Sequence, residues 1–175
     1  MSTLSVDTIQ GQTTAANVKL PEGSTLQTKS MTSVTIGHSA SGSTYSDTGL
    51  TVSITPKYAT SKILVMAHIN MGATNGYRFA CRLMRDSTAL SLPTDAGSRS
   101  VGTVAHQGSG GNMIDMNAAL FFLDSPATTN ATTYKIQAAC EQSGGTYYLN
   151  RGGTSSNNST VYGATSSITV LEIAQ

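Results

Sequence analysis

The chain has 175 residues, a formal net charge of +1 and a charged fraction of 11%, about half the share that is usual in globular domains. This length corresponds to one domain with at most a short appendage, and a body of this size can bury a hydrophobic core. Its polarity comes mainly from hydroxyl groups, with 23 serines and 26 threonines. Since threonine favours strands and serine favours turns, the composition predicts sheets that meet their neighbours through neutral hydrogen bonds.

The basic residues argue against a nucleic-acid partner. Phosphate backbones are bound by clustered lysine and arginine, and the ten basic residues here are scattered. The densest group is Arg78, Arg82 and Arg85. We interpret them as solvated or interface arginines along one strand, with a phosphate-binding patch as the alternative.

The chain shows no signal for export or membrane insertion. The start, Met1–Asp7, lacks a basic beginning and an apolar run, and no segment approaches the ~20 apolar residues of a membrane helix. We therefore expect a protein that is made in a cytoplasm and stays soluble. Cys81 and Cys140 each lie in phase with apolar neighbours, so we predict buried free thiols rather than a disulfide.

Residues 1–28 differ from the rest of the chain. They contain too few large apolar side chains to fold alone, and such a terminal segment needs a partner to hold it. We therefore expect an extended arm that anchors the protein to a partner. Its apolar side chains are the anchoring candidates: Val6, Ile9, Val18 and Leu20.

Residues 29–175 carry the pattern of an all-β domain. Short alternating apolar runs are separated by Gly, Ser, Asn and Pro clusters, and no run of ten or more residues has helical spacing. We predict an antiparallel two-sheet jelly-roll sandwich. The expected strands are Met31–Ile36, Leu50–Ile54, Ile63–Asn70, Tyr77–Arg85, Thr88–Leu92, Arg99–His106, Asn117–Leu123, Thr132–Glu141, Thr146–Asn150 and Thr160–Ile173.

Three strands are apolar on both faces. In the last one, Ile168 and Val170 point one way while Leu171 and Ile173 point the other; the runs 63–66 and 118–123 do not alternate at all. A strand at the surface of a sandwich should have one polar face, and no helices are expected to cover a second apolar one. We therefore predict a symmetric oligomer. The interface candidates are Leu120, Phe122, Tyr162, Ile168, Val170, Leu171 and Ile173.

Three segments carry a resemblance to a known family: Ile54–Val65, Thr146–Arg151 and Ser167–Ile173. Together they resemble the jelly-roll domain of tailed-bacteriophage virion proteins that are usually described as fibre-like. The beginning of the chain, Thr3–Gln10 and Val18–Pro21, is similar to the start of such proteins. The resemblance implies a fold like the tumour-necrosis-factor and complement globular-head jelly roll, and a homotrimer with the last strand near the threefold axis. No long shaft lies between arm and domain, which favours a short accessory protein docked on the capsid or tail.

Candidate catalytic groups form no recognisable set. The nine carboxylates show no marked pair, whereas a glycosidase needs two carboxyl groups ~5–10 Å apart. His38, His68 and His106 lack the close spacing of metal ligands. Three copies of His68 meeting on a threefold axis are the alternative to a structural histidine. We expect no enzyme activity, no cofactor and no metal.

The expected function is that of a non-enzymatic structural virion protein, which binds other virion proteins through residues 1–28. The alternative is a receptor-binding adhesin that recognises host surface glycan through loops of the jelly roll. Long polar loops are expected at Gln107–Asn112 and Gly152–Thr160, and rigid scaffolds commonly carry binding loops of this kind. Either Tyr147 or Tyr148 could present a ring to a sugar, with sheet packing as the commoner role.

Overall fold

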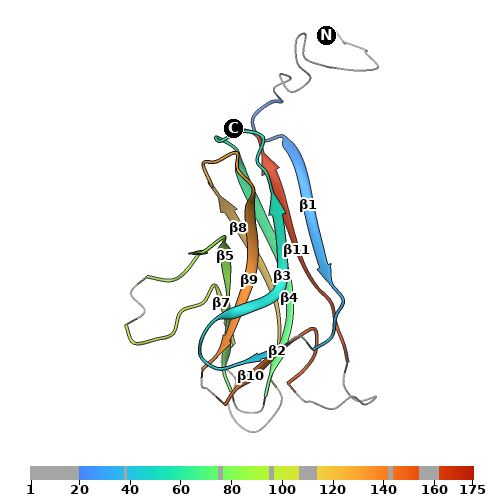
Figure 1. The fold of residues 1–175 in the computed structure, drawn as a ribbon, viewed down its shortest axis with the longest axis vertical. Helices are drawn as coiled ribbons and strands as arrows, with labels where there is room; N and C mark the ends of the chain where they lie inside the picture. Colours follow the sequence, from blue (N-terminus) through green and yellow to red (C-terminus); the bar gives the residue numbers. More distant parts are fainter. Residues whose placement is uncertain are drawn as a thin grey trace.

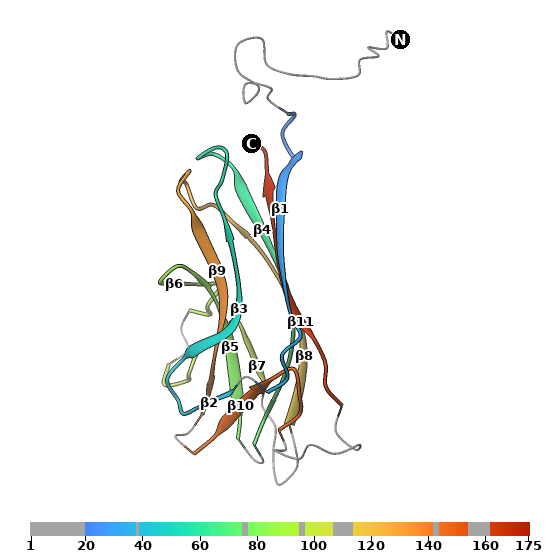
Figure 2. The same cartoon turned by 45° about the vertical axis from the view of Figure 1, so that its right-hand side comes forward.

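The computed structural model describes residues 20–37, 39–74, 77–94, 97–106, 114–141, 144–153 and 162–175. These residues form eleven strands and no helix, so the prediction of an all-β protein is confirmed. The strands make two antiparallel sheets that lie face to face, as the two views in Figures 1 and 2 show.

The first sheet, sheet A, is built around the long central strand β4. This strand pairs with β8 along one edge and with β11 and then β10 along the other; β1 pairs with β11, and β2 pairs with β10. The strands of sheet A are β1 (Thr25–Ser33), β2 (Ser39–Ser41), β4 (Lys62–Ala73), β8 (Ile114–Asp124), β10 (Thr146–Leu149) and β11 (Ser166–Ile173).

The second sheet, sheet B, has the order β3, β9, β5, with β6 and β7 both paired to β5. Its strands are β3 (Ser46–Ile54), β5 (Phe79–Arg85), β6 (Thr88–Leu90), β7 (Val104–His106) and β9 (Thr132–Cys140). The long strands alternate between the sheets along the chain, so β1, β4, β8 and β11 lie in one layer and β3, β5 and β9 in the other.

Strict alternation produces the core. In β3 the side chains of Leu50, Val52 and Ile54 are buried while Thr51 and Ser53 are exposed. Successive side chains of a strand point to opposite faces, so this pattern buries one face against sheet A. The same alternation holds in β4, β9 and β11, whose inward side chains close the core between the two sheets.

The sequence placed most strands well and missed some boundaries. β1 begins at Thr25, inside the segment assigned to the arm, and β11 begins only at Ser166. Residues 99–103 were expected in a strand but lie outside one, and β2 was not expected. These segments are rich in serine, threonine and glycine and contain few large apolar residues, so the local pattern carries little signal there.

A buried carboxylate joins two distant parts of the chain. Glu172 lies on the inward face of β11 and is fully buried. Its Oε1 accepts the backbone N–H of Lys57 at 2.7 Å and of Tyr58 at 3.4 Å, and its Oε2 accepts the amide of Gln27 at 2.6 Å. The end of β11 therefore holds the connection between β3 and β4 through charge-assisted hydrogen bonds.

A buried amide does the same at the other end of the sandwich. The Nδ2 of Asn150 donates to the backbone oxygens of Ser33 and Thr35, while its Oδ1 accepts the hydroxyl of Ser166 at 2.7 Å. Asn150 has a φ of 64°, a conformation that asparagine tolerates better than most residues. One side chain thus ties the exit of β1 to the exit of β10 and the start of β11.

We expect Glu172→Ala to lower the free energy of unfolding by about 2–4 kcal/mol, because it leaves buried donors without an acceptor. Urea denaturation at a fixed protein concentration measures the change. Glu22→Ala, which removes an exposed carboxylate, is the control and should unfold like the wild type. Equal denaturation midpoints for Glu172→Ala and the control would contradict this role.

Both cysteines are free and buried, as predicted. Burial raises the pKa of the Cys81 thiol to about 12 and that of Cys140 to about 11, so neither forms a thiolate at neutral pH. We expect the folded protein at pH 8 to leave a disulfide reagent such as dithionitrobenzoate unreacted for hours, and two thiols per chain to react in guanidinium chloride. Rapid reaction of the Cys81 or Cys140 thiol in the folded protein would contradict the burial of these residues.

Candidate oligomer interface

The outward face of sheet A carries a contiguous apolar patch. The register between β8, β4 and β11 places Leu123, Leu64 and Leu171 in one row across three strands. Phe121 and Met66 form the next row, which ends in threonine on β11. Paired residues of adjacent strands share one face of a sheet, so these side chains form one surface.

The patch is open to solvent in the single chain. Phe121 is 70% exposed and Leu123 is 52% exposed, while the outward side chains of Leu64, Met66 and Leu171 are half-buried. Burying one large apolar side chain contributes ~1.5–3 kcal/mol, so exposing a row of them is unfavourable. Monomeric proteins rarely expose such patches, which usually mark interaction surfaces.

The polar part of this face is mostly neutral, with Lys62, the partner of Ile173, as a charged residue at one end of the patch. Ser30 bonds Thr169 through their hydroxyls at 2.9 Å, at the end of the row that contains Phe121 and Met66. His68 Nε2 lies 3.1 Å from the Oδ1 of Asn117, whose amide donates to Asn70 at 2.9 Å. Such groups can meet a second copy without the desolvation cost of charges.

Strand β8 adds an unpaired edge beside the patch. Among the described residues it pairs with β4 alone, over the whole length from Ile114 to Asp124. Its charged residues, Asp115 and Asp124, stand near the ends of the strand and none lies between them. Natural edge strands usually carry lysine, proline or bulges that prevent pairing, and a long apolar edge without them invites a partner.

The predicted interface residues divide between the two faces of sheet A. Leu171 and Ile173 lie on the outward face, as the alternation of β11 required. Tyr162 is 88% exposed and lines a hollow with Asn70 and Asn117, which belong to the same outward face. These three residues are available to a partner.

The other four candidates face inward. Leu120, Ile168 and Val170 belong to the core of the single subunit, and Phe122 packs against that core. A partner cannot reach them while the two sheets stay packed, so the prediction that these four residues lie in an interface is wrong. The reason is the phase of alternation: both faces of these strands are apolar, and the sequence does not say which one the second sheet covers.

Sequence reasoning missed four residues of the patch: Leu64, Met66, Phe121 and Leu123. The runs that contain them were recognised as apolar on both faces. The apolar runs indicated that each strand has two apolar faces. The pairing of β4 with β8 and β11 was needed to decide which residues lie on the outward face.

The anchoring candidates fall mostly outside the described residues. Val6, Ile9 and Val18 lie outside them, and Leu20 is 47% exposed at their first position. The prediction of an anchoring arm therefore stays a prediction. The chain joins the body from Gly23 onward, where Gly23 N–H donates to the carbonyl of Ala174 at 2.9 Å.

Several of the carboxylates accept hydrogen bonds that hold neighbouring strands together. Asp124 accepts Arg85 and the Tyr134 hydroxyl, and Thr133 N–H donates to Asp86. Within the described ranges, no group of three or more His, Cys, Asp or Glu residues could hold a metal ion. In the same part of the chain, no helix is long and apolar enough to span a membrane.

The residues proposed for sugar contact are placed in part. Tyr147 is 1% exposed and its hydroxyl lies 2.8 Å from the hydroxyl of Ser46, so its ring cannot stack on a ligand. Tyr148 is half-buried, with the Arg151 guanidinium 3.9 Å from its ring centre. The loop Gln107–Asn112 lies outside the described residues, as does most of Gly152–Thr160.

No protein-family model matches the chain, and a search of curated proteins finds no significant match.

Proposed function

We propose that this protein is a non-enzymatic structural component of a bacteriophage virion and that it assembles as a homotrimer through the outward face of sheet A. The observation that carries the proposal is the exposed apolar patch around Leu64, Phe121 and Leu171, next to the open edge of β8. A second copy that covers this patch removes its apolar surface from water, which stabilises the assembly by ~25 cal/mol for each Å² buried.

The arrangement of the strands supports the jelly-roll part of the proposal. Successive long strands alternate between the two sheets, and the first long strand, β1, lies beside the last, β11. Double-sheet jelly rolls are built from strands of this kind. Threefold symmetry and location on a virion come from the resemblance of the segments Ile54–Val65, Thr146–Arg151 and Ser167–Ile173 to phage virion proteins.

Residues 1–19 precede the described body and are proposed to bind neighbouring virion proteins on the capsid or tail. The alternative function, a receptor-binding adhesin for host glycan, is compatible with the same assembly. The two functions would use different surfaces, because the trimer would bury the outward face of sheet A and leave the outward face of sheet B exposed.

We expect light scattering to give the mass of a trimer for the wild type, and Phe121→Glu and Leu171→Glu to weaken association by at least about 100-fold. Each change places a charge in an interface that is otherwise apolar. Ser53→Glu, which puts the same charge on the exposed face of β3, is the control and should keep the trimer. A monomeric wild type in dilute solution would overturn the proposal.

Deleting residues 1–19 should leave the trimer intact and abolish docking on the virion. The cut spares the bonds from Gly23 and Ser24 to Ala174 and the whole of β1. Light scattering and co-sedimentation with particles that lack this protein measure the two properties. Co-sedimentation that is unchanged by the deletion would show that the arm is not the anchor.

A further inference from the structure

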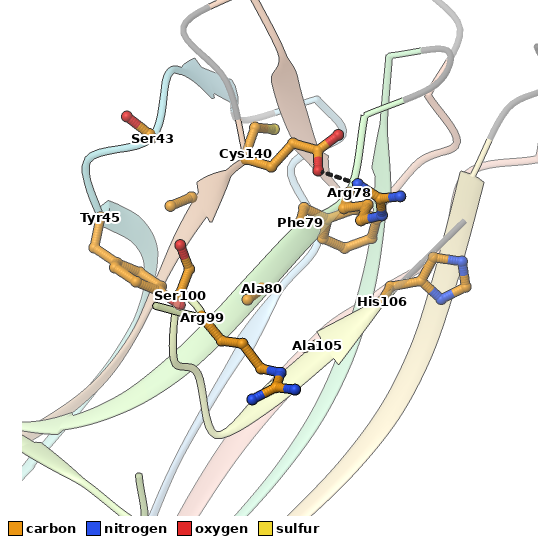
Figure 3. Close-up of a pocket in the computed structure, with 12 residues that line it drawn as sticks. Ser43, Tyr45, Arg78, Phe79, Ala80, Arg99, Ser100, Ala105, His106 and Cys140 are labelled. Atoms are coloured by element: carbon orange, nitrogen blue, oxygen red, sulfur yellow. Dashed lines mark hydrogen bonds and ion pairs between the residues drawn. The ribbon is translucent and has the colours of Figure 1, made fainter. Parts of the chain in front are cut away.

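The outward face of sheet B contains a hollow with an apolar floor. Ala139 on β9, Ala80 on β5 and Ala105 on β7 pair in one row across three adjacent strands, so their methyl groups share one face. Longer side chains stand on both sides of this row, and Figure 3 shows Ala80 between Tyr45 and Arg78. The row is therefore recessed, and the hollow above it has a volume of about 380 Å³.

An ion pair forms one wall of the hollow. Arg78, just before β5, and Glu141, just after β9, lie beside each other because the Glu141 N–H donates to the carbonyl of Arg78 at 2.9 Å. Their side chains meet as well, with Arg78 Nη1 donating to Glu141 Oε2 at 2.6 Å. This hydrogen bond holds the pKa of Glu141 below its usual range, so its carboxylate is charged at neutral pH. The pair thus presents donors and acceptors side by side without a net charge.

Tyr45 and the loop before β7 form the facing wall. The Tyr45 hydroxyl donates to the carbonyl of Val101 at 2.7 Å and holds this loop against sheet B. A Cβ at position 102 would lie 2.9 Å from the side chain of Ala80, so the loop can approach β5 this closely only because Gly102 has no side chain. The loop presents the hydroxyl of Ser100 to the hollow.

A chain of hydrogen bonds behind this wall holds Tyr45 in place. The Arg82 guanidinium lies 4.3 Å from the ring centre of Tyr45 and donates through Nε and Nη2 to the Oε1 of Gln137, at 2.9 and 2.7 Å. Gln137 donates on to Asp47 at 2.7 Å, and Lys135 donates to the same carboxylate at 2.8 Å. The wall is therefore ordered before a ligand arrives, which reduces the entropy cost of binding.

The charged groups that line the hollow already have partners within the chain. Arg78 and Glu141 neutralise each other, and Arg99, which also lines the hollow, has an interaction of its own. A charged ligand would have to displace one of these contacts before it gained an equivalent one. A neutral ligand can instead use the capacity that the ion pair leaves over, because a guanidinium and a carboxylate each take part in several hydrogen bonds.

We propose that this hollow binds a neutral sugar ring. A pyranose has an apolar C–H face, which matches the floor of three alanines, and hydroxyl groups that each donate and accept. Arg78 donates to one hydroxyl while Glu141 accepts from its neighbour, and Ser100 offers a further partner. Small-molecule sites combine a mostly apolar lining with a few placed polar groups in about 300–1,000 Å³, a range that includes this hollow.

The same lining argues against a purely apolar ligand and against a phosphate. A hydrocarbon would cover the ion pair without bonding its remaining donors and acceptors, which is unfavourable. A phosphate needs free cations, and the arginines that the sequence groups together are each bound to a side chain of another strand or its extension. These pairs are Arg78 with Glu141, Arg82 with Gln137, and Arg85 with Asp124.

This inference deepens the alternative function, since it gives the adhesin a site on sheet B and a neutral glycan as its ligand, and it does not rest on the trimer or on the virion. The hollow and the apolar patch lie on opposite layers of the sandwich, so the proposed trimer would leave three copies of the hollow facing outward. Three weak sites on one particle bind a polymeric glycan more tightly than one site does.

NMR titration of the full-length protein with isotope-labelled alanine methyl groups tests the site, because the floor itself then reports the ligand. The probes are the methyl glycosides of glucose, galactose and mannose, with glucuronate as the charged comparison. We expect at least one methyl glycoside to shift the signals of Ala80, Ala105 and Ala139 saturably, with a dissociation constant of about 1–10 mM, as is usual for so small a ligand. No saturable shift with any of the three overturns the proposal. Glucuronate that binds at least about tenfold more tightly than the best methyl glycoside also overturns it, because it would show an uncommitted positive charge in the lining.

A pair of alanine variants locates the binding. Ala105→Leu should abolish it, because Ala105 is exposed on β7 and a leucine there fills the hollow without entering the core. Ala131→Leu makes the same change at an exposed position outside the lining and should bind like the wild type. Unchanged binding in Ala105→Leu would place the sugar elsewhere and overturn the proposal.

Glu141→Gln tests the ion pair, since it keeps the size of the side chain and removes its charge. We expect the best methyl glycoside to bind about tenfold more weakly, and glucuronate to bind more tightly than in the wild type because Arg78 has lost its carboxylate partner. Glu22→Gln, at an exposed position outside the lining, is the control. Unchanged affinities in Glu141→Gln would contradict the contact with the ion pair. Light scattering on the same samples reports the trimer separately, so a failure of this site is distinguishable from a failure of the proposed assembly.

Discussion

The pairing of β4 with a strand on each side is the interaction on which the rest of the structure depends. Along its length β4 bonds β8 in one register and β11 in another, and these registers decide which side chains share a face. They send Ile63 and Val65 into the core and leave Leu64 and Met66 outside beside Phe121. A slip of one residue would exchange the two sets. Core and candidate interface are thus two consequences of one set of backbone hydrogen bonds.

The two outward faces of the sandwich differ in chemistry. Sheet A presents apolar side chains and mainly neutral polar groups, a surface suited to a second copy of the same chain. Sheet B presents ion pairs around a recessed row of alanines, a surface suited to a small polar ligand. Because the two surfaces lie on opposite layers, the proposed assembly would leave the outward face of sheet B accessible.

Buried polar side chains fasten the segments Ile54–Val65, Thr146–Arg151 and Ser167–Ile173 to one another and to the rest of the fold. Glu172, in the last segment, accepts the backbone N–H groups of Lys57 and Tyr58, in the first. Asn150, in the middle segment, ties together the ends of three strands in sheet A. These residues fasten connections that apolar packing alone cannot position.

The sequence by itself determined the fold class, most strand positions, the buried thiols and the presence of strands that are apolar on both faces. All of these depend on local alternation, which is written along one strand. Only the tertiary structure decided that Leu120, Ile168 and Val170 face the core while Phe121 and Leu171 face outward, because two apolar faces of one strand look alike until a second sheet covers one of them. It also created the hollow over Ala80, since three alanines from distant parts of the chain form a floor only when strand pairing brings them into register.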